Sequence, residues 1–134
     1  MAIVVDTDVI IRGEKGTFAL ASWLSNRPHE IFAVAAITIA ELWHGIERAT
    51  GSHRMKREAY LQKLLTKLTV LPYSQSTALI HAKVWAELEA AGAMIGYYDV
   101  MIAATAIELG YPVATFNLRH FQMVPRLVVI EPKI

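Results

Sequence analysis

The stretch Ile3-Val4-Val5-Asp6-Thr7-Asp8-Val9-Ile10 decides the fold of this chain. Its first three residues form a short apolar, β-branched run, which is typical of a strand buried on both faces of a parallel sheet. Asp6 follows that run directly, and open α/β folds bind their ligands at the carboxyl edge of the sheet. The pattern therefore predicts that Asp6 is the hub of an acidic metal site. The alternative is a helix cap after the strand, a role that suits Thr7 or Asp8.

The composition limits the class of protein. The chain has 134 residues, the usual size of one domain, and we expect residues 1–134 to form a single one. It has no cysteine, which excludes disulfides, a thiolate nucleophile and Cys-ligated zinc. No apolar run approaches the ~18 residues of a spanning helix, and no signal peptide is visible, so we expect a cytoplasmic protein without a membrane partner. A net charge of +1 is low for a protein that binds nucleic acid by charge alone.

Strand-like and helical patterns alternate along the rest of the chain. Apolar runs predict further strands at residues 31–35, 70–71, 112–115 and 127–130, with amphipathic helices between them. Thr38 and Ser76 are the expected N-caps of two of these helices, and Glu41 completes a capping box with Thr38. The alternation predicts a three-layer α/β/α fold around a largely parallel sheet.

Such a fold gathers polar residues at one edge of the sheet, because right-handed crossovers bring all strand carboxyl ends there. Asp6 ends the first strand, Glu41 lies early in the helix after the second, and Asn117 follows the fourth. Asp99 joins them only if its helix begins at that same edge. Gathered carboxylates stay ionised only when a cation compensates their charge. Oxygen ligands suit Mg²⁺ or Mn²⁺, and such an ion can activate water for phosphodiester hydrolysis.

Four motifs, in this order, resemble the PIN-domain ribonucleases, and most closely the VapC-type toxins of toxin–antitoxin pairs. They are Asp6-Thr7-Asp8-Val9-Ile10, Thr38-Ile39-Ala40-Glu41-Leu42 with Gly45, Asp99 to Ala106, and Thr115-Phe116-Asn117-Leu118-Arg119-His120-Phe121. The resemblance implies a five-stranded parallel sheet and cleavage of RNA that depends on Mg²⁺ or Mn²⁺. It also implies a homodimer, inhibition by a cognate antitoxin protein, and contact with DNA only through that antitoxin.

The resemblance also assigns roles by position. Asp6, Glu41 and Asp99 match the acidic metal-binding triad of the family. Asn117 matches a fourth catalytic position that is Asp in many members and Asn in many toxins, so it keeps an oxygen ligand and loses a charge. Asp8 stands where the family often has Asn, and we interpret it as the helix cap rather than a ligand.

Several other side chains are candidates for RNA contact or for support of the acids. The hydroxyls of Thr7 and Thr115 can position a ligand water, and His120 can approach a scissile phosphate. Cationic candidates for phosphate contact are Arg12, Arg119, Arg126 and the segment Arg54-Met55-Lys56-Arg57, although the segment also fits a solvated helix face. Candidates for base stacking are Trp43, Tyr97, Tyr98 and Trp85, the last of which also suits the core or a dimer interface. His44 fits a supporting or surface role.

Two rival functions fit parts of the chain. The segment Val4 to Val9 also matches the opening motif of haloacid-dehalogenase-type phosphatases, in which Asp6 would be the nucleophile. That mechanism needs a later acidic pair after a strand, and none follows residues 113–115. The other rival is a catalytically weak domain that only binds RNA or a partner, and Asn117 in place of Asp keeps it open.

Overall fold

The fold is built on a five-stranded sheet, described by a computed structural model that covers residues 2–134. The strands are β1 (Ala2–Val5), β2 (Ile31–Ala35), β3 (Thr69–Leu71), β4 (Val113–Ala114) and β5 (Val129–Ile130). They lie in the order β3-β2-β1-β4-β5, and every neighbouring pair is parallel. All strand carboxyl ends therefore meet at one edge, with β1 at the centre. The predicted three-layer α/β/α fold is confirmed.

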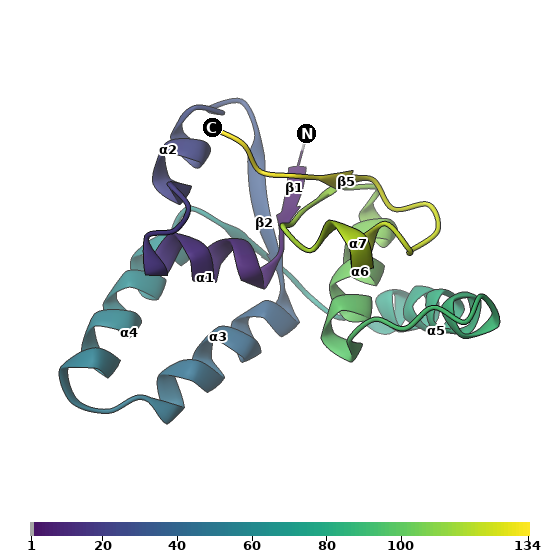
Figure 1. Ribbon diagram of the computed structural model, residues 1–134, viewed down its shortest axis with the longest axis horizontal. Coiled ribbons are helices and arrows are strands. Elements are labelled where there is room, and N and C mark those ends of the chain that lie inside the picture. The colour runs from purple at the N-terminus through teal and green to yellow at the C-terminus, as the bar shows by residue number, and fades with distance from the viewer. Residues whose placement is uncertain (1) are drawn as a thin grey trace.

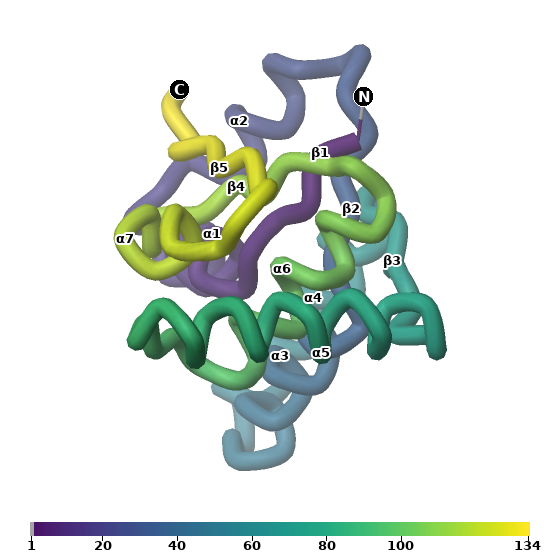
Figure 2. Tube along the Cα trace, turned by 90° about the vertical axis from the view of Figure 1, so that its right-hand side faces the viewer, coloured from purple at the N-terminus to yellow at the C-terminus, as the bar shows by residue number. Residues whose placement is uncertain are grey.

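Helices cover both faces of this sheet (Figure 1). One face carries α1 (Thr7–Lys15), α2 (Leu20–Ser25), α3 (Ala36–Arg48) and α4 (Gly51–Leu65). The other carries α5 (Gln75–Ala90), α6 (Tyr97–Leu109) and the short α7 (Leu118–Phe121). Figure 2 shows α5 crossing in front of α6, so α6 is the inner helix of that layer.

The sheet divides the core in two. Ile3 and Val5 face the α1–α4 layer, whereas Val4 between them faces α5 and α6. Val4 and Val5 are both fully buried, which explains why the first strand is a continuous apolar run rather than an alternating one. On α6, the small residues Ala103 and Ala106 are completely buried and let the helix lie close to the strands.

Two helices begin earlier than predicted. The chain passes from β2 directly into α3, whose N-cap is Ala35, so Thr38 lies inside the first turn and forms no capping box with Glu41. Ser74, not Ser76, caps α5 and forms the capping box with Thr77. In both cases the predicted cap is two or more residues late, because the cap is the last residue with extended backbone and not the nearest hydroxyl.

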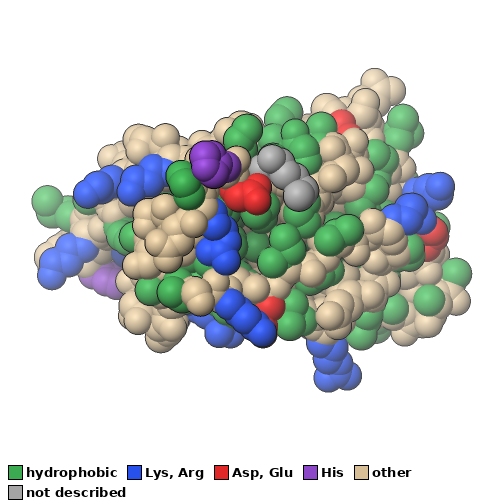
Figure 3. Space-filling view, turned by 90° about the horizontal axis from the view of Figure 1, so that it is seen from above, with side chains coloured by type: hydrophobic (Ala, Val, Ile, Leu, Met, Phe, Trp, Pro, Cys, Tyr) green, Lys and Arg blue, Asp and Glu red, His purple; other side chains and the backbone are tan. Residues whose placement is uncertain are grey.

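Within residues 2–134, no helix combines the length and the apolar character that crossing a bilayer requires. Figure 3 looks onto the amino ends of the strands, where acidic side chains lie apart from one another among hydrophobic and basic ones. The acids that come together do so at the opposite, carboxyl edge, which is described next.

Candidate functional site

Asp6 occupies the point where β1 ends and α1 begins. Its backbone is still extended, and the residue is 3% exposed. Oδ1 accepts a hydrogen bond of 2.8 Å from the Thr7 amide, and Oδ2 accepts one of 2.7 Å from the Thr115 hydroxyl. Asp6 is therefore the N-cap of α1, and the prediction that Thr7 or Asp8 fills that position is wrong. The reason is that Thr7 is already the first helical residue.

Thr115 reaches Asp6 because β4 pairs with β1. Val5 is opposite Ala114, so the next residue on each strand lies side by side at the carboxyl edge. The Thr115 hydroxyl also accepts a hydrogen bond of 2.9 Å from the main-chain N–H of Asn117. Thr115 thus fixes the Asp6 carboxylate and the start of the Asn117 loop at once.

Asp8 lies in the first turn of α1 beside Asp6. Its Oδ1 is buried without a hydrogen-bond partner in residues 2–134. Burial, followed by the negative charge of Asp8, raises the pKa of Asp6 to about 8. Burial also raises the pKa of Asp8, although a contact with Asp6 and the main chain of Phe116 oppose that rise.

Glu41 and Asp99 bring two further carboxylates to the same edge. Burial raises the pKa of both, and each also senses other acids: Asp99 raises the pKa of Glu41, and Asp8 raises that of Asp99. Asp99 lies in the first turn of α6. Its helix therefore begins at the carboxyl edge, as the predicted site requires.

A threonine network holds Glu41. The Thr7 hydroxyl donates to Glu41 Oε1 over 2.7 Å and lies 3.0 Å from the hydroxyl of Thr38. Thr7 is the donor in both contacts, so its single hydroxyl proton is shared between Glu41 and Thr38, with the shorter contact to Glu41. Thr38 is completely buried. Sequence reasoning assigned it to a cap and missed this supporting role, although its position three residues before Glu41 on the same helix was a usable signal.

The donor set fits a hard divalent cation. Several carboxylates lie near one another at partly buried positions, and one buried oxygen of Asp8 has no hydrogen-bond partner in the described residues. A bound cation would satisfy that oxygen and compensate the negative charges. Within residues 2–134, however, no three His, Asp or Glu side chains already stand in the arrangement of a metal site. The carboxylates lie close enough to affect one another's pKa, but they do not already surround one metal position. Their mutual repulsion accounts for this separation.

Asn117 is connected to the acids through other residues rather than by a direct contact. Its amide nitrogen lies 3.1 Å from His120 Nδ1, and an amide nitrogen can only donate. In this arrangement Nδ1 is the acceptor, so the proton of the neutral ring is on Nε2. When it is protonated, His120 lowers the pKa of Asp99, which places the ring next to the acids. The structure thus links Asn117 to the site through Thr115 and His120.

Some of the arginines predicted to contact phosphate are free of ion pairs in the described residues, and others are paired with an acid. Arg12 lies 4.4 Å above the ring of Phe116, and its charge lowers the pKa of Asp8, so it borders the site. Arg119 is exposed on α7. Arg126 is bound through both terminal nitrogens to Glu87, at 2.9 and 2.7 Å, so a phosphate would have to compete with this ion pair.

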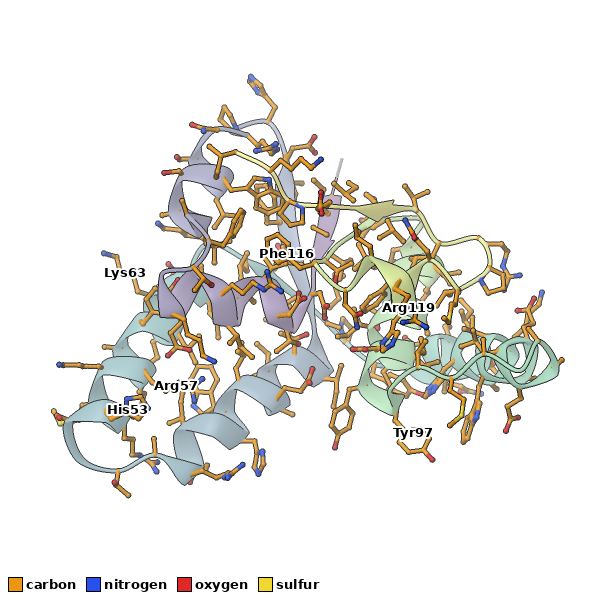
Figure 4. All side chains as sticks on the ribbon, in the orientation of Figure 1. His53, Arg57, Lys63, Tyr97, Phe116 and Arg119 are labelled. Atoms are coloured by element: carbon orange, nitrogen blue, oxygen red, sulfur yellow. The ribbon has the colours of Figure 1, made fainter. Side chains whose placement is uncertain are left out.

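The aromatic side chains that are candidates for base stacking differ in their exposure. Trp43 is partly buried and packs against the core, and His44 is exposed. Tyr97 is 75% exposed and extends away from the sheet (Figure 4), and Tyr98 is 54% exposed. Trp85 is 47% exposed, which contradicts a core position. Its ring lies 5.8 Å from that of the half-buried His81 and 6.2 Å from that of Tyr97, so the three form an aromatic row.

Comparisons with known proteins agree with this architecture. The PIN domain family model matches residues 3–127. Ribonuclease VapC of Rickettsia bellii is 31% identical over 131 residues, covering 97% of this chain and 96% of that protein. The tRNA(fMet)-specific endonuclease VapC of Salmonella typhimurium is 35% identical over 92 residues, or 69% of this chain and 68% of the relative.

Solved structures show the same fold. In the crystal structure of DNA-bound VapBC from Salmonella typhimurium, one chain is 26% identical and superimposes with a TM-score of 0.90, covering 99% of both chains. These likenesses favour the nuclease over the phosphatase and over the domain that only binds. The chain belongs to the PIN-domain family and, within it, to the VapC ribonucleases.

Proposed function

We propose that this protein is an endoribonuclease that depends on Mg²⁺ or Mn²⁺, with Asp6, Glu41 and Asp99 as its metal ligands. The observation that carries the proposal is the convergence of these acids with Asp8 at the carboxyl edge, where burial raises the pKa of each and the charge of a neighbouring acid raises those of Asp6, Glu41 and Asp99 further. A bound divalent cation would supply a water of lowered pKa and stabilise the charge that develops on the phosphate.

The chain's own residues orient these groups. Thr115 and the Thr7 amide hold both oxygens of Asp6, so this carboxylate is fixed before any ligand binds. The Thr7 hydroxyl holds Glu41 in turn. His120 lies close enough to Asp99 to affect its pKa, so it is placed to donate a hydrogen bond to a phosphate oxygen at the site. In this scheme Asn117 positions His120.

We further propose that the protein is the toxin of a toxin–antitoxin pair and is inhibited by a cognate antitoxin protein. Relatives named VapC ribonucleases, and a structural neighbour described as DNA-bound VapBC, support this role. DNA would then be contacted through the antitoxin, and a homodimer is the expected form. RNA cleavage of this kind would slow translation or growth.

The decisive assay incubates purified protein with a panel of RNAs in Mg²⁺, Mn²⁺ or EDTA. The panel includes initiator tRNA, since one relative is named for that substrate. Asp99→Asn is the inactive comparison, because it removes one charge and keeps the shape of the side chain. We expect cleavage with either metal and none with EDTA or with the variant. Cleavage that persists in EDTA or in Asp99→Asn would refute a metal nuclease.

A further inference from the structure

A cleft of about 640 Å³ opens beside the acidic group, between α1, α3 and α4. Its lining includes Glu41, which places one wall at the proposed metal site. From there it continues along Lys15 at the end of α1 and along His53, Lys56 and Tyr60 on α4. The volume is in the ~300–1,000 Å³ range of ligand clefts. The cleft is therefore an extension of the catalytic edge rather than a separate pocket.

An ion pair fixes the shape of this cleft. Arg57 on α4 donates from Nε and Nη2 to the two carboxylate oxygens of Glu14 on α1, at 2.7 and 3.1 Å. Figure 4 shows Arg57 extending from α4 toward α1, whereas Lys63 on the same helix points away from the cleft. The guanidinium lies against α3, where a Cβ on Gly45 would overlap it. A glycine at position 45 thus lets Arg57 hold α4 at its distance from α1 and α3.

The charges in the lining favour a polyanion. Arg57 and Glu14 neutralise each other, and Glu41 belongs to the acidic group that a cation would neutralise. The formal charges that remain are those of Lys15 and Lys56, both exposed and without a salt bridge in residues 2–134. His53 adds a further donor to the same wall. Two free ammonium groups beside a metal site match the phosphates that flank a scissile bond.

We infer that this cleft holds the RNA strand on one side of the scissile phosphate, with Lys15 and Lys56 as its phosphate contacts. The inference rests on the proposed ribonuclease function and adds the path of the substrate. Arg57 is a positioning residue in this scheme, because its guanidinium is already satisfied by Glu14. Tyr60 stands partly exposed in the wall between the lysines and the core.

The test measures RNA binding by fluorescence anisotropy, with labelled initiator tRNA, in an Asp99→Asn background that prevents turnover. Lys15→Gln/Lys56→Gln is compared with Lys63→Gln/Lys67→Gln, which alters one exposed lysine in the last turn of α4 and another just beyond its end. Each phosphate contact contributes about 0.7–0.9 to the slope of log affinity against log salt. We expect the first pair of substitutions to reduce that slope by about 1.5 and to weaken binding at least tenfold at low salt, and the second pair to change neither.

Equal slopes for the two double variants would overturn the assignment of RNA to this cleft. Should Lys15→Gln/Lys56→Gln fail to fold, cross-linking of 4-thiouridine-substituted RNA to the Asp99→Asn protein decides instead. Cross-links to residues 53–60 support the cleft, and cross-links confined to the aromatic row on α5 and α6 contradict it. Failure of the parent enzyme to cleave RNA with Mg²⁺ or Mn²⁺ would instead refute the proposed function, which separates the two results.

Discussion

The buried acid Asp6 predicts an unusual dependence of stability on pH. Without metal, the folded protein holds the Asp6 proton up to a pKa of about 8, whereas the unfolded chain releases it near the ordinary value of 3.8. Between these values the folded state binds more protons than the unfolded state. The free energy of unfolding must therefore fall as pH rises from about 4 to 8, and level off above that. Asp6→Asn removes the titrating group.

The size of this effect follows from the same two pKa values. Each pKa unit is worth ~1.4 kcal/mol, so Asp6 alone would lower the free energy of unfolding by about 3–4 kcal/mol between pH 5 and pH 8. Asparagine keeps the Oδ1 that accepts from Thr7, and the Thr115 hydroxyl can accept from the new amide instead of donating to a carboxylate. The variant should therefore fold, and at pH 8 without metal it should be the more stable protein.

The assay is urea unfolding followed by circular dichroism in EDTA at pH 5, 6, 7 and 8. Glu89→Gln, which alters an exposed acid on α5, is the matched control and should follow the parent protein. With Mn²⁺ in place of EDTA, the parent protein should be stabilised most at pH 8, by ~2.7 kcal/mol at a free metal concentration a hundred times the dissociation constant, and Asp6→Asn should be stabilised little. A parent protein whose stability is flat from pH 5 to pH 8, or a variant with the parent's slope, would refute this reasoning.

Three further substitutions test the framework of the site. Thr115→Ala removes the donor to Asp6 and should destabilise the protein by ~1–3 kcal/mol and lower kcat in an RNA cleavage assay. Thr115→Ser keeps the hydroxyl and should keep the stability and the kcat of the parent protein. An alanine variant as active as the serine variant would contradict this role of Thr115. Gly45→Ala should destabilise the protein by ~1–3 kcal/mol, because the new methyl group would overlap Arg57. In a double-mutant cycle, Arg57→Ala should relieve much of that loss, and purely additive effects of the two substitutions would disprove the overlap. Asp99→Asn should leave the thermal unfolding midpoint in EDTA unchanged or higher, while calorimetry detects weaker Mn²⁺ binding than in the parent protein; undiminished binding would exclude Asp99 as a ligand.

The sequence predicts the fold well because its signals are local and repeated. A short β-branched run that lacks alternation is typical of a strand buried on both faces, and alternating strands and helices leave a parallel sheet as the simplest arrangement. From that topology alone, Asp6 and Glu41 come to one edge. The placement of Asp99 depended on where α6 begins, and the family resemblance supported it before the structure did.

What the sequence alone determined, then, was the sheet, its order of layers and the set of acids at its carboxyl edge. Tertiary structure decided which partner each polar group has. It made Asp6 a helix cap as well as a candidate ligand, joined Thr7 to Glu41 across 34 positions, and paired Arg126 with Glu87 across 39. Such choices depend on which side chains meet between elements distant in sequence. Hydrophobic periodicity fixes the faces of those elements but carries no information about which polar neighbours their ends will find.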